Sequence, residues 1–123
     1  MKIDELNHVA LLVRDVEASS RFYREVIGLN SIPRPGFSFP GAWFRIGAQQ
    51  ELHLIKGEFD GAPDDSGRRD HFALRVADVD EAAKDLRDRG AGFRGPVHRA
   101  DGARQIFLRD PDGHILELCG ELP

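Results

Sequence analysis

The sequence has little cysteine and no long apolar run, and both shortages limit what the protein can be. Cys119 is the single cysteine among 123 residues, so the chain forms no internal disulfide and does not depend on an oxidising compartment. No stretch approaches the ~18 apolar residues that span a bilayer. The first residues also lack the basic and apolar regions of a signal peptide. These features predict a cytoplasmic protein without a membrane anchor.

An excess of positive charge is also absent. The formal net charge is −4, from 17 Lys and Arg against 21 Asp and Glu. Nucleic-acid binding depends on basic side chains that contact phosphates, so nucleic acid is not expected as the main partner. A length of 123 residues with 41% hydrophobic content predicts one domain with a working core.

The chain contains an internal repeat. Residues 7–16 are NHVALLVRDV and residues 70–79 are DHFALRVADV, and His8 and His71 occupy the same place in the two stretches. Each stretch predicts a strand that leads into a helix, with an aspartate, Asp15 or Asp78, as the N-cap. A glycine marks the end of each predicted helix; these glycines are Gly28 and Gly90.

Each half then closes with further strands. Short strand-like runs occupy residues 43–46 and 106–109, and each is followed by a turn. The last strands are predicted over 51–55 and 115–119, and aligning them makes His53 the counterpart of Glu117.

The sequence therefore predicts an α+β fold of two tandem β-α-β-β-β modules whose curled sheets surround a central cavity. We expect one domain over residues 1–123. Its parts are module one at about 4–57, a connector at about 56–69 that is rich in Gly, Asp and Pro, and module two at about 69–121.

Strand parity places four side chains on the faces away from the helices, because successive side chains of a strand point to opposite faces. Two such sheets side by side would bring these four groups to one centre. They are His8, His53, His71 and Glu117. Three imidazoles and a carboxylate suit a divalent ion such as Zn, Ni, Mn, Co or Fe(II).

Simpler explanations compete with this metal site. A lone strand histidine is more often structural, and His53 can line the cavity without binding a metal ion. The repeated position of His8 and His71 favours the metal site, as does the high cost of burying an uncoordinated carboxylate at Glu117. Arginines with the same parity can neutralise an anionic substrate or be solvated rim charges. These arginines are Arg45, Arg75 and Arg109.

The paired modules resemble the vicinal oxygen chelate superfamily, which includes glyoxalase I, fosfomycin-resistance enzymes, bleomycin-resistance proteins and extradiol dioxygenases. The resemblance rests on NHVA at residues 7–10, Phe22-Tyr23, DHFA at 70–73 and DPDGHILE at 110–117. It is closest to small glyoxalase-I-like proteins and implies a divalent metal ion held by His8, His53, His71 and Glu117. In that superfamily the metal chelates two neighbouring oxygens of the substrate.

The chain departs from authentic glyoxalase I at three positions. His53 stands where that enzyme has a glutamate, and Leu12 and Gly57 stand where it has glutathione-binding arginine and asparagine residues. These departures argue against glutathione as the cofactor. Phe107 replaces the tyrosine of fosfomycin-transferring enzymes, which argues against that activity.

Three functions from different classes follow from the resemblance. The leading expectation is a metal-dependent lyase or isomerase that acts on a small molecule with vicinal oxygens, with Glu117 and His53 as catalytic groups. The second is an Fe(II) ring-cleaving-type dioxygenase, in which His8, His71 and Glu117 form a 2-His-1-carboxylate triad. The third is a metal-free small-molecule binding protein of the bleomycin-resistance type.

The repeat also predicts assembly. Each module carries only two of the four candidate ligands, so a complete site needs two modules. The connector permits pairing within one chain or exchange between two chains, and the resemblance favours a homodimer with shared sites.

Overall fold

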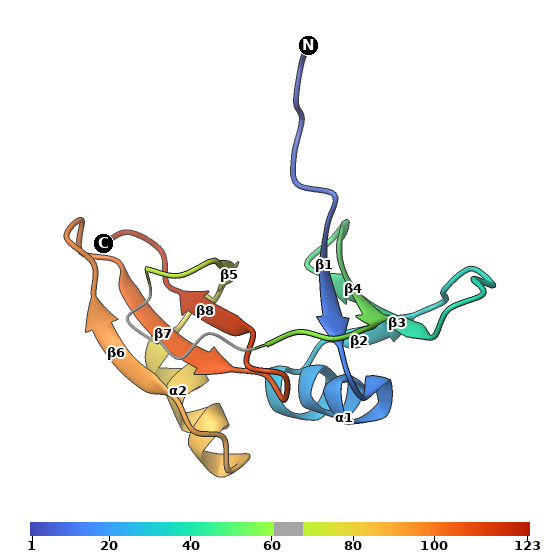
Figure 1. Cartoon of the computed structure of the whole chain (residues 1–123). Coiled ribbons are helices and arrows are strands. Elements are labelled where there is room, and N and C mark those ends of the chain that lie inside the picture. Colours follow the sequence, from blue (N-terminus) through green and yellow to red (C-terminus); the bar gives the residue numbers. More distant parts are fainter. Residues whose placement is uncertain (61–67) are drawn as a thin grey trace. The chain divides into compact units, whose positions relative to one another are not determined.

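The computed structural model describes residues 1–60 and 68–123, which form two compact units, Met1–Phe59 and Asp60–Pro123. Figure 1 shows that each unit contains one sheet with helical segments on one of its faces. The connector expected over 56–69 falls largely on residues 61–67, which lie outside the described residues. Each unit is described by itself below.

Unit 1 follows the predicted order of elements. Its strands are β1 (His8–Val13), β2 (Asn30–Ile32), β3 (Gly41–Ile46) and β4 (Gln50–Lys56), and its helical segments are α1 (Val16–Arg21) and the π-helix η1 (Phe22–Ile27). The sheet order is β1-β4-β3-β2, with β1 parallel to β4 and the other pairs antiparallel.

Unit 2 repeats this plan. It contains β5 (His71–Arg75), α2 (Val79–Asp88), β6 (Arg94–His98), β7 (Arg104–Arg109) and β8 (Ile115–Cys119). The sheet order is β5-β8-β7-β6, and β5 is parallel to β8. Two open, four-stranded mixed sheets with few helices confirm the predicted α+β fold of two β-α-β-β-β modules.

One face of each sheet is apolar and packs against the helix. In unit 1 the buried residues include Tyr23, Phe44, Leu52 and Leu54, each at most 1% exposed. In unit 2, Leu86 of α2 is buried along with Ile106 and Leu116 of the sheet. Because side chains alternate along a strand, the residues between these apolar positions project from the opposite face. That opposite face carries the candidate ligands.

The helix boundaries follow the predicted caps. Asp15 Oδ1 accepts from the backbone N–H of Ala18, and Asp78 Oδ1 accepts from those of Asp80 and Glu81. Gly28 has φ of 90° at the end of η1, a left-handed conformation that glycine adopts without the strain of a Cβ atom. The predicted single helix over residues 16–27 is an α-helix that continues as a π-helix, a difference that apolar spacing does not reveal.

The α2 cap leads to a first prediction. Replacing Asp78 by Ala leaves two first-turn N–H groups without their acceptor, so the free energy of unfolding should fall by about 1 kcal/mol. Urea denaturation measures this change. Asp85→Ala is the matched control, since Asp85 lies inside the helix and contacts Arg89 at a distance of 3.7 Å. Equal losses in the two variants would contradict a capping role for Asp78.

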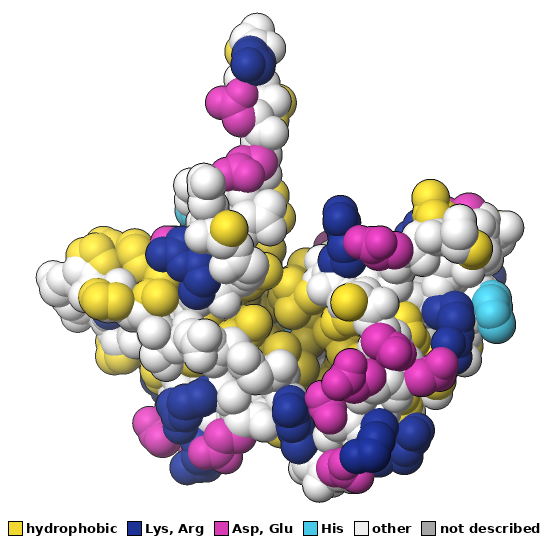
Figure 2. Space-filling view, turned by 180° about the vertical axis from the view of Figure 1, so that it is seen from behind, with side chains coloured by type: hydrophobic (Ala, Val, Ile, Leu, Met, Phe, Trp, Pro, Cys, Tyr) yellow, Lys and Arg dark blue, Asp and Glu magenta, His cyan; other side chains and the backbone are white. Residues whose placement is uncertain are grey.

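Among the described residues, no helix has the length and apolar character needed to cross a membrane. Figure 2 shows basic and acidic side chains interspersed over the visible surface. The surface drawn there therefore does not present the broad basic field that nucleic-acid binding requires.

Candidate metal site and its surroundings

The first and last strands of each unit place two candidate ligands on the face away from the helix. In unit 1, β1 and β4 pair His8 with Glu51 and Ala10 with His53. In unit 2, β5 and β8 pair His71 with Ile115 and Ala73 with Glu117. The two registers are equivalent, so His53 and Glu117 occupy corresponding positions.

His71 and Glu117 face one another in unit 2. Nδ1 of His71 lies 2.6 Å from the carbonyl oxygen of Arg69. A carbonyl oxygen only accepts, so Nδ1 carries the hydrogen, and Nε2 of the neutral ring is left with a lone pair. That Nε2 lies 3.5 Å from Oε1 of Glu117. Two electron-rich atoms therefore face each other across a gap that a proton or a metal cation can bridge.

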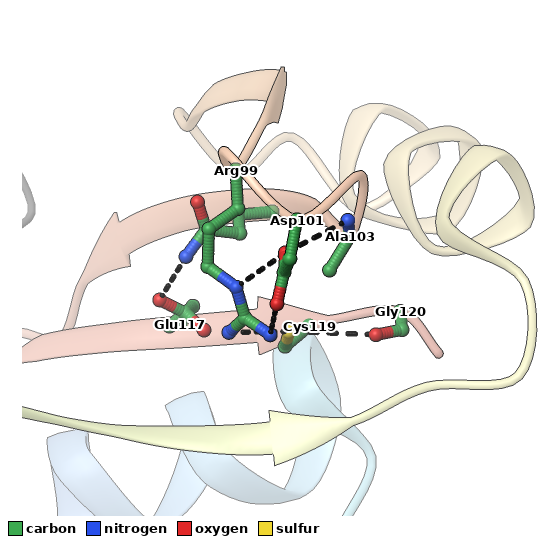
Figure 3. A network of polar contacts seen from close by, with 7 residues as sticks. Arg99, Asp101, Ala103, Glu117, Cys119 and Gly120 are labelled. Atoms are coloured by element: carbon green, nitrogen blue, oxygen red, sulfur yellow. Dashed lines mark hydrogen bonds and ion pairs between the residues drawn. The ribbon is translucent and has the colours of Figure 1, made fainter. Parts of the chain in front are cut away.

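Glu117 is a buried carboxylate, with 4% of its surface exposed. Nε2 of Gln105 donates to its Oε1 at 2.8 Å. Figure 3 shows Glu117 on its strand near Arg99 and Cys119, with Arg99 held by Asp101 at 2.8 Å. A buried charge with so few donors is costly unless a cation compensates it, so this site fits a divalent ion.

In unit 1, a hydrogen bond fixes the tautomer of His8 in the same way. Its Nδ1 lies 2.8 Å from Oδ1 of Asn7, an acceptor, which leaves Nε2 with the lone pair. A ligand histidine is commonly oriented in this way by a hydrogen bond from its other nitrogen. The neighbours of His8 and His71 in the sequence therefore orient both rings for coordination through Nε2.

His53 differs from the other two histidines. Its ring stacks between Trp43, at a centroid distance of 3.9 Å, and His8, at 4.2 Å. Its Nε2 lies 2.9 Å from Oε1 of Glu51, and Oε2 of Glu51 lies 3.3 Å from Nη1 of Arg45. Because a carboxylate accepts from Nε2–H, the lone pair of the neutral His53 ring is at Nδ1.

Cys119 shares the face of Glu117, because the two lie two residues apart on β8. Burial raises the pKa of its thiol, and the negative charge of Glu117 raises it further. A raised pKa lowers the fraction of reactive thiolate, which fits a small group that lines the site more than it fits a nucleophile.

The structure brings the four predicted ligands together in two pairs. Unit 1 holds His8 with His53, and unit 2 holds His71 with Glu117. Within residues 1–60 and 68–123, no group of three or more His, Cys, Asp or Glu side chains has the geometry of a metal site. Each unit by itself therefore offers two of the four predicted groups.

Two polar residues beside the candidate ligands were missed in the sequence. Glu51 lies two residues before His53 on β4, so strand parity alone could have placed it on the same face. Gln105 lies on β7 opposite Cys119, diagonal to Glu117. Its contact with Glu117 depends on the pairing register of β7 and β8, and no sequence motif predicts that register.

The chain belongs to the glyoxalase/bleomycin resistance protein/dioxygenase superfamily, whose family model matches residues 5–118. The chain is similar to Glyoxylase I 4 of Arabidopsis thaliana, with 29% identity over 97% of this chain and 72% of the relative.

Solved structures show the same relationship. A glyoxalase-family structure from Bacillus anthracis has a TM-score of 0.82 and 29% identity, and 98% of each chain is covered. TnmS3, an antibiotic binding protein from Streptomyces, has a TM-score of 0.78 and 30% identity, also with 98% of each chain covered. The family resemblance predicted from the sequence is thus confirmed.

Proposed function

We propose that the protein is a metal-dependent enzyme of the glyoxalase-I-like type, a lyase or isomerase that acts on a small molecule with two neighbouring oxygens. His8, His71 and Glu117 hold the metal ion, and His53 is the fourth ligand or the base. The observation that carries this proposal is the lone pair of His71 Nε2 facing the buried carboxylate of Glu117 at 3.5 Å. Membership of the superfamily and the likeness to Glyoxylase I 4 support it.

When bound, a divalent ion supplies Lewis acidity that stabilises negative charge developing on the substrate oxygens. Glu117 provides the negative charge of the site, and Gln105 fixes the orientation of that carboxylate. Glu51 accepts from His53 Nε2–H, so it stabilises the imidazolium that forms when Nδ1 takes a proton. Stacking on Trp43 holds the His53 ring in one plane.

The same proposal treats the two units as one functional domain. Since each unit holds two of the four groups, the site is complete only where a first unit meets a second unit. We propose that the two come from different chains of a homodimer, each dimer having two shared sites.

A metal analysis tests the proposal. Protein purified and then incubated with Zn, Ni, Mn or Fe(II) should retain close to one divalent ion per chain. His8→Ala and His71→Ala should abolish retention, whereas His53→Ala should weaken it by roughly tenfold to a hundredfold if His53 is only a supporting group. His98→Ala, on the exposed end of β6, is the control histidine. Wild-type protein that stays metal-free with all four metals would contradict the proposal.

The arrangement of His53 bears on the dioxygenase alternative. If its Nε2 stays with Glu51, the remaining ligands His8, His71 and Glu117 form the triad found in Fe(II) oxygenases. Oxygen consumption by the Fe(II)-loaded protein with a catechol distinguishes the two enzymes. Conversion of a vicinal-oxygen substrate without any loss of dissolved oxygen supports a lyase or isomerase.

A metal-free binding protein is the third candidate, and a run of aromatic side chains in unit 1 favours it. From His53 the rings continue through Trp43 to Phe37, with centroids 6.1 Å apart, and to Phe39, 5.0 Å further. Phe37 and Phe39 are both exposed, and flat aromatic ligands stack on such surfaces. The antibiotic-binding neighbour TnmS3 also supports this candidate. Thermal stabilisation by a flat aromatic compound in the presence of EDTA would favour binding over catalysis.

A further inference from the structure

Unit 2 contains a cavity of about 350 Å³, which is lined by residues of β6, β7 and β8 and of the segment just before β6. Aromatic and aliphatic side chains form part of its lining, including Phe93, Phe107 and Ile115. Two arginines, Arg94 and Arg109, also line it. The cavity thus combines an apolar surface with two positive charges.

The strand register places this cavity on the ligand-bearing face. One cross-strand row runs from His71 through Ile115 to Arg109. Residues that are paired across neighbouring strands project from the same face of a sheet. With neighbouring strands about 4.8 Å apart, the backbone of Arg109 lies roughly 10 Å from that of His71.

A second row gives Arg94 an equivalent place. This row runs from Glu117 through Phe107 to Arg94. The Arg94 guanidinium lies 4.7 Å from the centroid of the Phe107 ring, and the ring of His71 contacts the same Phe107 edge-on at 5.9 Å. Phe107 therefore lies between Glu117 and Arg94, as Ile115 lies between His71 and Arg109.

The internal repeat provides a comparison for Arg109. Its counterpart in unit 1 is Arg45, which pairs across the strands with Glu51 and contacts that carboxylate at 3.3 Å. In unit 2, Arg109 pairs across the strands with Ile115. The acidic partner present in unit 1 is thus replaced by an apolar residue in unit 2.

The replacement leaves positive charge without a carboxylate partner. Nη1 of Arg109 donates to the carbonyl oxygen of Gly113 at 2.9 Å, but its buried Nη2 has no hydrogen-bond partner in the described part of the chain. A buried guanidinium nitrogen without an acceptor is costly. Neither Arg94 nor Arg109 forms an ion pair with any described residue.

We propose that this cavity binds a carboxylate group of the substrate, with Arg109 and Arg94 as the cationic partners. A guanidinium offers two parallel N–H groups that match a carboxylate. This inference deepens the proposed function, on which it rests for the metal end of the substrate. The substrate class is a small anionic molecule with vicinal oxygens at one end and a carboxylate at the other.

The experiment compares two probes that differ by one carboxylate, catechol and 3,4-dihydroxybenzoate, by calorimetric titration of the Mn-loaded protein. Wild type should bind 3,4-dihydroxybenzoate roughly tenfold to a hundredfold more tightly than catechol. Arg109→Gln and Arg94→Gln should each reduce that preference while leaving catechol binding unchanged. Arg104→Gln is the matched control, because Arg104 lies on the same strand but pairs with Asp80 of α2 at 2.8 Å.

The outcomes separate the two proposals. An equal affinity for both probes in wild type overturns the carboxylate site, as does a preference that survives in both arginine variants. Arg94→Gln covers the case in which Arg109→Gln disturbs the turn at Gly113. Catechol affinity that is the same with Mn and with EDTA contradicts the metal proposal, whereas a carboxylate preference that still depends on Arg109 supports the cavity inference.

Discussion

Replacing Glu117 by Gln should lower the affinity for a divalent metal by more than the roughly hundredfold that loss of an outer-shell partner costs. The substitution keeps the size of the side chain and removes the charge from the buried centre of the proposed site. An amide oxygen is a weaker ligand for a divalent ion than a carboxylate. Competition with a chromogenic chelator measures the change in affinity.

Metal-dependent stability gives a second measurement of the same variant. At a free metal concentration of 100 times Kd, wild type should gain about 2.7 kcal/mol of stability, because the metal binds the folded state only. Glu117→Gln should gain almost nothing under these conditions. Glu121→Gln is the matched control, since Glu121 is an exposed carboxylate that contacts Arg75 at 3.9 Å.

The metal-free form of the variant separates ligation from folding. In wild type, the Glu117 carboxylate is buried with Gln105 as a donor and faces the lone pair of His71. Replacing that charge by a neutral amide of similar volume should leave the metal-free protein as stable as before or slightly more stable. A large loss of stability without metal, together with unchanged metal affinity, would show that Glu117 is a structural residue.

The periodicity of the sequence was sufficient to predict the sheet face on which each proposed ligand lies. The repeat placed His8 and His71 at the start of equivalent strands, and alternation put His53 and Glu117 opposite the buried leucines. The caps Asp15 and Asp78 were also readable, because a short acceptor before an apolar helical pattern is a local signal. These features depend on neighbours within a few residues.

Other features depend on pairing between distant segments and were not readable. Strand β2 has three residues, and β6 contains Gly95 and Pro96, which favour turns when judged locally. Gln105 reaches Glu117, and Arg109 lacks a carboxylate, only because β7 and β8 adopt one particular register. Sequence patterns specify which face a residue occupies more reliably than which residue lies beside it.

The assembly prediction with the largest expected effect is complementation between two chains that each fail to bind metal. A His8→Ala/His53→Ala chain retains the unit 2 pair, and a His71→Ala/Glu117→Ala chain retains the unit 1 pair. Neither chain alone has a complete set of ligands in any arrangement. After the two are refolded together, a heterodimer with shared sites contains one intact site and one empty site, so metal binding should return to about half of the wild-type amount per heterodimer.

A chain that closes both of its own units around the metal gives the opposite result. Every site in the mixture then lacks two ligands, and refolding together restores no binding. Light scattering on the wild type gives an independent measurement, because a shared site requires a dimer at the concentration where metal is bound. A wild-type monomer with full metal occupancy would therefore exclude shared sites, and the sites would have to form within one chain.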